Sequence, residues 1–381
     1  MSKNRSGGFP IFGLIGFFLT VFAVYWLAMN VHPQLGNTTY APEEGKTVNI
    51  IGDNLSNFAN NAKASALDGQ VYIRKIYTIP ENDTIAPKPN PACYGVTTNP
   101  EEVQAVVDKA AELIGDSKLT WNKDIELYGD EFKDAVIEYY YDETILVITW
   151  RQMVNGAVCT CAEVKIADPS QLRRYLAGNG YGSTTREYAT NMSSYVNAVI
   201  AINGDFYDFR QNGITVYQRK LYRFEPKYVD SCFFTSSGDM LFVRRTEMTE
   251  QSEAEQFIKD NDVLFALAFG PVLVDNGVAE QTWAYPIGEV TTHYSRAAIG
   301  QIDDLHYFLM TVNTVPGGST AATINDSAQM MCDFGCRKAY ALDGGQTAVM
   351  TMQGKTVNRV DWGTERTISD IIYFATAIPG K

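Results

Sequence analysis

Histidine is scarce in this 381-residue sequence, and its three copies, His32, His293 and His306, are far apart. No two of them have the spacing of a zinc-binding helix, so a histidine-rich zinc enzyme is not expected. Cations are also in deficit, with 31 Lys and Arg against 44 Asp and Glu and a formal net charge of −13. Nucleic acid is therefore not an expected partner, because neutralising its phosphates requires clustered cations.

Three familiar enzyme signatures are missing as well. The sequence contains no Gly-x-Ser-x-Gly, no phosphate-binding P-loop and no dinucleotide-binding glycine pattern. These absences argue against serine hydrolases, NTPases and Rossmann enzymes. What is present is a globular composition, with 45% hydrophobic and 12% aromatic residues, which can fill a core.

One long uncharged stretch lies near the N-terminus. Residues 9–29 carry no charged side chain and as a helix would span roughly 30 Å, about the thickness of a bilayer core. Lys3 and Arg5 precede the stretch and no cation follows until Lys46, so the positive-inside rule places residues 1–8 in the cytoplasm. We expect a single-pass anchor in the cell membrane and an extracellular C-terminal domain. A cleaved signal peptide is the alternative, but the stretch is longer than usual for one.

The remaining chain divides by composition. Residues 30–92 are polar, rich in Asn and end in a proline cluster, which is typical of an extended stalk. Residues 93–143 are expected to form a small subdomain around a helix from Pro100 to Ile114, which Asn99 can cap. Residues 144–381 form the predicted main domain, because strand patterns become dense from there.

The main domain is predicted to be α+β, with a mixed β-sheet core and flanking helices. Runs of β-branched residues at 144–150 and 158–166 are joined through Asn155-Gly156, a hairpin signal. The runs at 198–202 and 263–269 are apolar on both faces, as in covered central strands. Farther on, a strand, a helix and a second strand follow one another in a βαβ pattern, with bounds near 305–315, 319–335 and 338–342.

Six cysteines are present, at positions 93, 159, 161, 232, 332 and 336. An even number in an exported chain permits disulfides without requiring them. Cys159 and Cys161 would share one face of a strand, which is a poor geometry for a bond between them. We expect most of the six to be small core residues rather than metal ligands.

Polar residues follow the buried strand at 198–202. Asn203, Gly204 and Asp205 come directly after it, and Tyr207 follows. The end of a central strand is where sheets often bind ligands, and Asp can serve there as base, nucleophile or metal ligand. The structural alternative is an ordinary Asn-Gly-Asp turn.

A similar group follows the strand at 338–342. Asp343 is followed by Gly344, Gly345, Gln346 and Thr347. Two glycines after an Asp allow a backbone path that brings N–H groups round an anion. The alternative is a simple strand-ending turn.

Several charged residues could complete such a site. Arg296, in a loop of the predicted fold, offers a guanidinium that matches phosphate or carboxylate, with a salt bridge as the alternative. The other candidates are Glu365, Arg366 and Asp370 before the last strand, and the Arg186-Glu187 pair, which could face the same site or solvent. A divalent cation, Ca²⁺ or Mg²⁺, is left open, because clustered Asp could bind one.

Taken together and in order, five segments resemble the phosphodiester glycosidase family. That family includes the catalytic domain of N-acetylglucosamine-1-phosphodiester α-N-acetylglucosaminidase and many bacterial surface proteins. The segments are A-I-N-G-D-F-Y at 201–207, F-G-P-V-L-V at 269–274, R-A-A-I-G-Q at 296–301, L-D-G-G at 342–345 and R-T-I-S-D-I-I-Y at 366–373. The resemblance runs from about residue 158 to 374.

The resemblance implies hydrolysis of a sugar-1-phosphodiester in a glycan or envelope polymer. An oxocarbenium-like transition state needs nearby carboxylates, for which Asp205 and Asp343 are the first candidates. Arg296 and Arg366 are the candidates for the phosphate, and Asn203 and Gln346 for sugar hydroxyls. The expected partners are thus a sugar phosphate or cell-envelope glycan, and the membrane through residues 9–29.

One departure from the family pattern stands out. Members commonly read Gly-Ser-Ser-Thr-Met after L-D-G-G, whereas residues 346–350 here read Gln-Thr-Ala-Val-Met. Lost hydroxyls could change the substrate or the activity. The alternatives are therefore a non-catalytic module that binds glycan or wall polymer, and an accessory protein of exopolysaccharide assembly.

Overall fold

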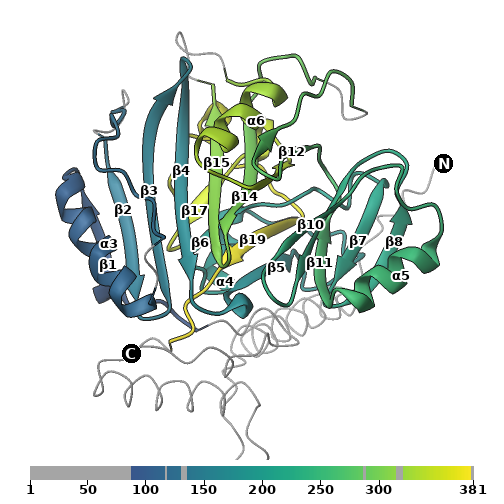
Figure 1. Cartoon of the computed structure of the whole chain (residues 1–381), viewed down its shortest axis with the longest axis horizontal. Helices are drawn as coiled ribbons and strands as arrows, with labels where there is room; N and C mark the ends of the chain where they lie inside the picture. The colour runs from purple at the N-terminus through teal and green to yellow at the C-terminus, as the bar shows by residue number, and fades with distance from the viewer. Residues whose placement is uncertain (1–86, 116–117, 130–134, 286–288, 315–320, 379–381) are drawn as a thin grey trace, which may run out of the picture. The chain divides into compact units, whose positions relative to one another are not determined.

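The computed structural model describes residues 87–115, 118–129, 135–285, 289–314 and 321–378 (Figure 1). The predicted cytoplasmic tail and membrane anchor, at 1–8 and 9–29, lie outside these residues, as does the predicted stalk up to residue 86. Among the helices of the described part, none is long and apolar enough to cross a bilayer.

Nine strands form the largest sheet, in the order β1-β2-β3-β4-β15-β14-β16-β12-β13 (Figure 1). Their bounds are β1 Tyr94–Thr97, β2 Ile137–Asp142, β3 Ile145–Val154, β4 Ala157–Ile166, β12 Val272–Asp275, β13 Val278–Ala279, β14 Arg296–Asp303, β15 His306–Asn313 and β16 Lys338–Leu342. The β3–β4 hairpin turns at Asn155 and Gly156, both at positive φ, which confirms the predicted turn.

Two five-stranded sheets complete the described strands, in the orders β10-β9-β11-β7-β8 and β18-β17-β6-β19-β5. The first contains β7 Gly213–Tyr217, β8 Lys220–Glu225, β9 Ser231–Thr235, β10 Met240–Val243 and β11 Val263–Leu267. The second contains β5 Leu172–Leu176, β6 Ile200–Asn203, β17 Met350–Met352, β18 Lys355–Thr356 and β19 Asp370–Phe374. Every residue of β6 and β11 is buried, as their apolar sequences predict.

Helices lie against these sheets and confirm the α+β class. They are α3 Pro100–Ile114, α4 Ala189–Tyr195, α5 Gln251–Asp260 and α6 Ile324–Asp333. In Figure 1, α3 covers the β1–β2 edge, α5 lies beside β8 and β11, and α6 packs on β12, β14 and β16. The α3 helix has the predicted bounds, because Asn99 accepts the N–H of Glu101 and Gly115 ends it at φ 69°.

The strand directions correct the expectation of a mixed sheet. Every pair in the described part of the chain is antiparallel. The βαβ path from β15 through α6 to β16 exists, but β14 lies between the two strands and pairs antiparallel with each. Arg296 accordingly begins a strand and does not lie in a loop.

Residues 93–143 join the main sheet, where we had expected a separate subdomain. The β2–β3 hairpin carries the chain across the expected boundary, with Asp142 opposite Ile145. The apolar face of α3, including Val103 and Val107, packs in the same core cluster as Trp150 of β3. The described chain from residue 87 onward is one compact unit for this reason.

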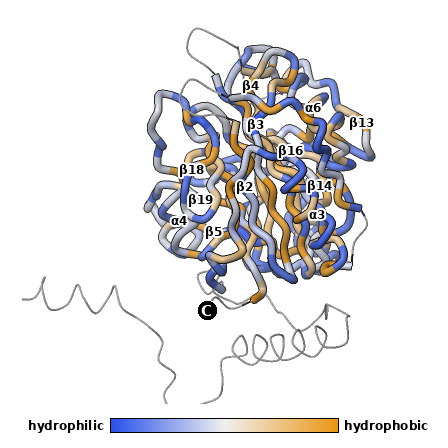
Figure 2. The backbone as a smooth tube through the Cα atoms, turned by 90° about the vertical axis from the view of Figure 1, so that its left-hand side faces the viewer, coloured by the Kyte–Doolittle hydropathy of each residue, from blue (hydrophilic) through white to orange (hydrophobic). Residues whose placement is uncertain are grey.

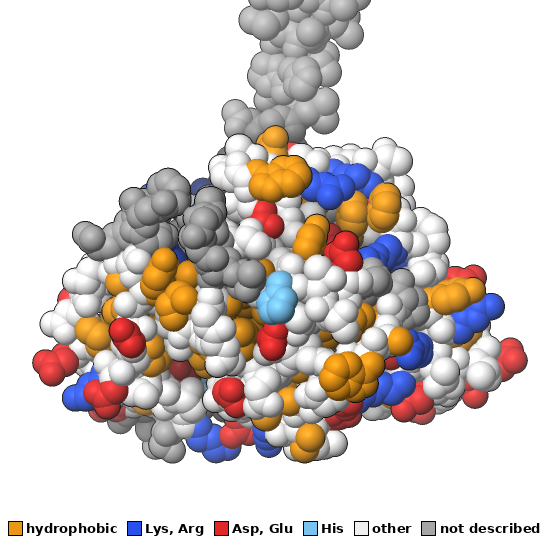
Figure 3. Space-filling view, turned by 90° about the horizontal axis from the view of Figure 1, so that it is seen from above, with side chains coloured by type: hydrophobic (Ala, Val, Ile, Leu, Met, Phe, Trp, Pro, Cys, Tyr) orange, Lys and Arg blue, Asp and Glu red, His pale blue; other side chains and the backbone are white. Residues whose placement is uncertain are grey.

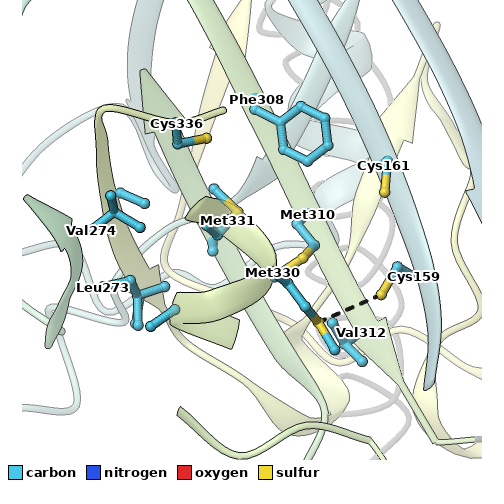
Figure 4. Packing of buried hydrophobic residues seen from close by; sticks show 14 of the residues in the cluster. Cys159, Cys161, Leu273, Val274, Phe308, Met310, Val312, Met330, Met331 and Cys336 are labelled. Atoms are coloured by element: carbon cyan, nitrogen blue, oxygen red, sulfur yellow. Dashed lines mark hydrogen bonds between the residues drawn. The ribbon is translucent and has the colours of Figure 1, made fainter. Parts of the chain in front are cut away.

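The core between α6 and the large sheet is rich in sulfur. Cys159, Cys161 and Cys336 are buried there, and the Cys159 thiol donates to Met330 Sδ at 3.8 Å (Figure 4). All six cysteines are free, and four of them, Cys159, Cys161, Cys232 and Cys336, are buried, so the expectation that most are small core residues is confirmed. Figure 2 shows hydrophobic segments along the packed strands and hydrophilic ones in the outer turns.

Candidate active site

The ends of β6 and β16 meet, as the sequence predicts for its two polar motifs. The N–H of Asp343 donates to the carbonyl oxygen of Gly204 at 3.2 Å. The Asn203 amide donates to the Asp343 carbonyl at 2.7 Å and accepts the N–H of Val349 at 3.2 Å. Asn203 is 1% exposed, so its side chain joins the two strand ends and is not presented to a sugar.

Asp205 lies in the interior, although the sequence suggested that it faces the site. Its side chain is fully buried. Oδ1 accepts from Arg174 Nη2 at 2.6 Å and from the N–H of Tyr207 at 3.1 Å, and Oδ2 accepts from the N–H of Ala268 at 2.7 Å. Both oxygens are thus occupied by donors from the protein, and we correct the predicted location of this carboxylate.

Asp370 shares the same arginine. Arg174 Nε donates to Asp370 Oδ2 at 2.8 Å, and its Nη1 donates to the carbonyl oxygen of Ala266 at 2.5 Å. Burial, together with the charge of Asp205, raises the pKa of Asp370 against the opposing effect of Arg174. Gly204 packs on this carboxylate so closely that an added Cβ would come within 1.9 Å of Asp370 Oδ2. Arg174, Asp205 and Asp370 therefore form a buried ion cluster.

Asp343 has a different environment, because the residue stays partly exposed at the end of β16. Its Oδ1 accepts the N–H of Gly344 at 3.0 Å. Burial raises the pKa of Asp343 to about 6, although the Thr347 hydroxyl and the charges of Arg210 and Arg366 act in the opposite direction. A carboxyl group with this pKa exchanges protons near neutral pH, which is the property that acid–base catalysis needs.

Three arginines lie around Phe206 and Asp343. The guanidinium carbons of Arg186 and Arg366 lie 4.8 and 5.4 Å from the centre of the Phe206 ring. That of Arg210 lies 4.3 Å from the Phe269 ring, and burial lowers the pKa of Arg210. We call Arg186, Arg210 and Arg366 the arginine group. Arg186 Nε donates to Asp208 Oδ2 at 2.8 Å, and the charges of Arg210 and Arg366, which act on Asp343, suit an anion such as phosphate.

Figure 3 looks onto one face of the molecule, with a single histidine near its centre. His293 lies 3.8 Å from Asp326 and is an exposed pair partner. Lys and Arg side chains gather mainly on the right of this face, among hydrophobic ones.

Arg296 holds a loop, although the sequence suggested that it binds phosphate. Its guanidinium donates to the carbonyl oxygens of Ala322 at 3.0 Å and of Glu289 and Thr292 at 2.7 Å each. It is 7% exposed. Arg210 is the cation near Asp343 that the sequence analysis missed, and the only signal for it was its place five residues after Asp205.

Four other candidates have structural contacts. Tyr207 is 2% exposed and stacks on Tyr181, with ring centres 5.3 Å apart, so it is not presented to a sugar. Glu365 accepts from the N–H of Thr190 and the hydroxyl of Thr356. The last two are the Arg186-Glu187 pair: Arg186 Nε donates to Asp208 Oδ2 at 2.8 Å, and Glu187 pairs with Ile368 through the backbone, which brings the pair beside the Glu365–Asp370 segment.

The glycine-rich loop after Asp343 is fixed on both sides. The N–H of Gly345 donates to the Ser295 carbonyl at 2.8 Å, and the residue adopts a φ of 68°. The Thr347 hydroxyl donates to the Gly344 carbonyl at 2.6 Å, and Gln346 Nε2 donates to the Thr364 carbonyl at 3.0 Å. The two other positions that depart from the family pattern, 348 and 349, are fully buried. The departure therefore affects the core and the loop contact more than the exposed surface.

The site does not suit a divalent cation. No group of three or more His, Cys, Asp or Glu side chains within the described ranges is arranged to hold one. The chemistry of the donors agrees, because Asp205 and Asp370 are paired with Arg174 and Asp343 lies near Arg210. Carboxylates neutralised by guanidinium groups are poor partners for a second cation.

Comparison with known proteins shows which protein family the site region resembles. Residues 196–375 match the family model described as phosphodiester glycosidase. This match supports the resemblance of this part of the chain to the phosphodiester glycosidase family. This family is one of hydrolases, and the matched segment contains Asp343, Arg210 and Arg366.

Individual relatives are distant. The uncharacterized protein YomE of Bacillus subtilis, derived from the SPbeta prophage, is 26% identical over 202 residues, or 50% of this chain and 30% of that protein. The chain thus spans under a third of this relative's length. The zebrafish N-acetylglucosamine-1-phosphodiester α-N-acetylglucosaminidase catalytic domain aligns with a TM-score of 0.48 and 16% identity over 61% of this chain and 83% of that one. A hypothetical protein from Synechocystis aligns with a TM-score of 0.47 and 15% identity over 63% and 64%.

Proposed function

We propose that this chain hydrolyses a sugar-1-phosphodiester by cleaving the bond between the anomeric carbon and a phosphate oxygen. The proposal is supported above all by Asp343 at the end of β16, because burial raises its pKa to about 6 and the charges of Arg210 and Arg366 act on its carboxylate. The arginine group would bind the phosphate, and the Asp343 carboxylate would lie at the anomeric carbon.

The division of roles follows from the chemistry of the leaving group. A phosphomonoester has a second pKa near 6 and leaves with the electron pair of the broken C–O bond without strong general-acid assistance. Arginine N–H groups stabilise the charge that develops on its oxygens. Ionised Asp343 then stabilises the oxocarbenium-like carbon and accepts the proton of the attacking water, so that free sugar and a phosphomonoester are the products.

The buried ion cluster contributes to this reaction by positioning the backbone that holds Asp343. Asp205 and Asp370 hold Arg174, and the same backbone turn at Gly204 accepts the N–H of Asp343. We therefore assign Asp205 a positioning role in place of direct contact with substrate. For the chain as a whole we propose an extracellular location and anchoring through residues 9–29, which the uncharged sequence there supports. A glycan or envelope polymer is the substrate that suits this location.

The test is direct. The full-length chain is incubated with a panel of sugar-1-phosphodiesters, with and without chelator, and free sugar is measured. Release of sugar that survives the chelator is expected, and the Asp343→Asn variant should release none. Binding of the compounds without any release would instead support the non-catalytic glycan-binding alternative.

A further inference from the structure

A tryptophan stands exposed next to the glycine-rich loop. Trp362 is 88% exposed, the highest value among the large hydrophobic side chains of the described residues. Its backbone is in the left-handed region, with φ 64° and ψ 10°, and Gly363 follows at φ 75°. A left-handed non-glycine residue costs on the order of 1 kcal/mol, and an exposed indole gains nothing from burial. Packing among the described residues therefore does not account for this residue.

The segment that carries the indole is attached to the loop of Asp343 at two points. On one side, Asp361 Oδ1 accepts the Ser295 hydroxyl at 2.8 Å, and the carbonyl oxygen of the same serine accepts the N–H of Gly345. On the other side, Gln346 Nε2 donates to the carbonyl oxygen of Thr364 at 3.0 Å. The segment that carries the exposed ring is thus held beside the loop, because residues on both sides of Trp362 are hydrogen-bonded to it or to Ser295.

The same segment continues to the arginine group. Arg366 lies four residues after Trp362 and places its guanidinium over Phe206. One short stretch of chain therefore presents a flat aromatic surface and, next to it, a cation beside Asp343. Indole rings offer large, rigid apolar faces, and the C–H faces of a pyranose ring are the carbohydrate surface that such a ring can cover.

We propose that Trp362 is a stacking platform for a pyranose ring whose phosphate is bound by the arginine group, and that Gln346 and Asp361 are its positioning residues. This inference rests on the proposed function, since it takes the sugar phosphate as ligand. It assigns the ligand class as hexopyranosyl phosphates, recognised by ring face and phosphate together.

Calorimetric titration of the full-length chain tests the platform. The probes are α-D-glucose 1-phosphate, N-acetyl-α-D-glucosamine 1-phosphate and inorganic phosphate, which lacks the ring. Trp362→Ala should weaken binding of at least one sugar phosphate about tenfold or more and change binding of inorganic phosphate less than about twofold. Trp362→Phe should restore most of the loss. Tyr195→Ala is the matched control: Tyr195 is 69% exposed and precedes the start of β6, opposite the end that carries Asn203.

Three results would overturn the platform: unchanged sugar-phosphate binding in Trp362→Ala, an equal loss for inorganic phosphate, or no binding of either sugar phosphate by the unaltered chain. Hydrolysis of the sugar-1-phosphodiester panel, measured in parallel, separates this outcome from the proposed function. Binding that depends on Trp362 without sugar release leaves the platform standing and refutes catalysis. Sugar release that Trp362→Ala leaves unchanged refutes only the platform.

The positioning role has its own test. Gln346→Ala should weaken sugar-phosphate binding while leaving inorganic phosphate unaffected, because only the ring contact depends on the held segment. The double variant Gln346→Ala, Trp362→Ala should bind no more weakly than Trp362→Ala alone. Fully additive losses would show that Gln346 acts independently of Trp362 and would contradict the assignment.

Discussion

The backbone N–H of Asp343 donates to the carbonyl oxygen of Gly204 across 3.2 Å, so two strand ends from different sheets are in direct contact. The acidic side chains beside this contact have opposite environments. Asp205 is paired with Arg174 in the interior, whereas Asp343 stays partly exposed near Arg210. Removing the charge of one or the other should therefore have opposite effects on stability.

Asp343→Asn should lower kcat by about a thousandfold or more, because the carboxylate that accepts the proton is lost. The same change should stabilise the fold by about 1–3 kcal/mol at pH 7.5, since a raised pKa means that the buried charge costs free energy. Turnover and urea unfolding of the two proteins measure these effects. Wild-type turnover in the variant would remove Asp343 from the mechanism.

Asp205→Asn should destabilise the fold by about 3–5 kcal/mol, because it removes one partner of a buried ion pair. Asp262→Asn is the control. Asp262 is paired with Arg219 at 2.7 Å, but both side chains are more than half exposed, so the cost should stay below about 1 kcal/mol. Equal urea midpoints for the two variants would contradict the assigned role of the buried ion cluster.

The pH dependence should follow Asp343. Its pKa is raised from 3.8 to about 6, so kcat/KM should increase as the pH rises through about 6 and the carboxylate ionises. The free energy of unfolding should change in the opposite direction and decrease as the pH rises. The folded chain binds this proton more tightly than the unfolded chain, so the contribution of Asp343 is present at low pH and is lost between about pH 4 and 6. The stability difference between Asp343→Asn and the unaltered chain should accordingly grow across that interval in urea titrations, and a constant difference would exclude the raised pKa.

Substitution of Arg210 should affect the KM for phosphodiesters selectively, whereas substitution of Arg296 should affect stability. Arg210→Ala should raise KM for a phosphodiester about tenfold or more and affect a neutral aryl glycoside much less, because only the first carries the anionic group. Arg296→Ala should instead lower the melting temperature, since three loop carbonyls lose their donor. A selective KM effect in Arg296→Ala with unchanged stability would restore the original assignment of Arg296 to phosphate.

Gly204→Ala should prevent the close approach at the buried ion cluster. An added Cβ would lie 1.9 Å from Asp370 Oδ2, far inside contact distance. We expect a loss of more than about 2 kcal/mol or a failure to fold. Gly180→Ala is the control, because nothing lies within 4 Å of a Cβ at that position. Similar thermal unfolding of both variants would contradict the packing described for Gly204.

Features with local causes could be predicted from the sequence. The α3 helix is set by Asn99 and Gly115 at its ends, and β16 has the predicted bounds because its apolar run is short and bounded. The meeting of the two polar motifs was also predictable, since each directly follows a buried strand. These signals lie within a few residues of what they determine.

Other features depend on partners far along the chain. The strand β14 was missed because Ala297, Ala298 and Gly300 are weak strand formers, yet Gly300 is required where an added Cβ would come within 2.6 Å of the Cys336 sulfur. The sequence analysis also missed Arg174. Its run Leu-Arg-Arg-Tyr-Leu gives no sign of burial, because its carboxylate partners are 31 and 196 residues away.

Arg174 precedes the segment that matches the family model, which begins at residue 196. A truncated product limited to that segment would enclose Asp205 and Asp370 without their counter-ion, and its β19 would lose the neighbour supplied by β5. The part of the chain that has to fold together is therefore longer than the segment that matches the family model. Any excised version meant to keep the candidate site intact has to start upstream of Leu172, where β5 begins.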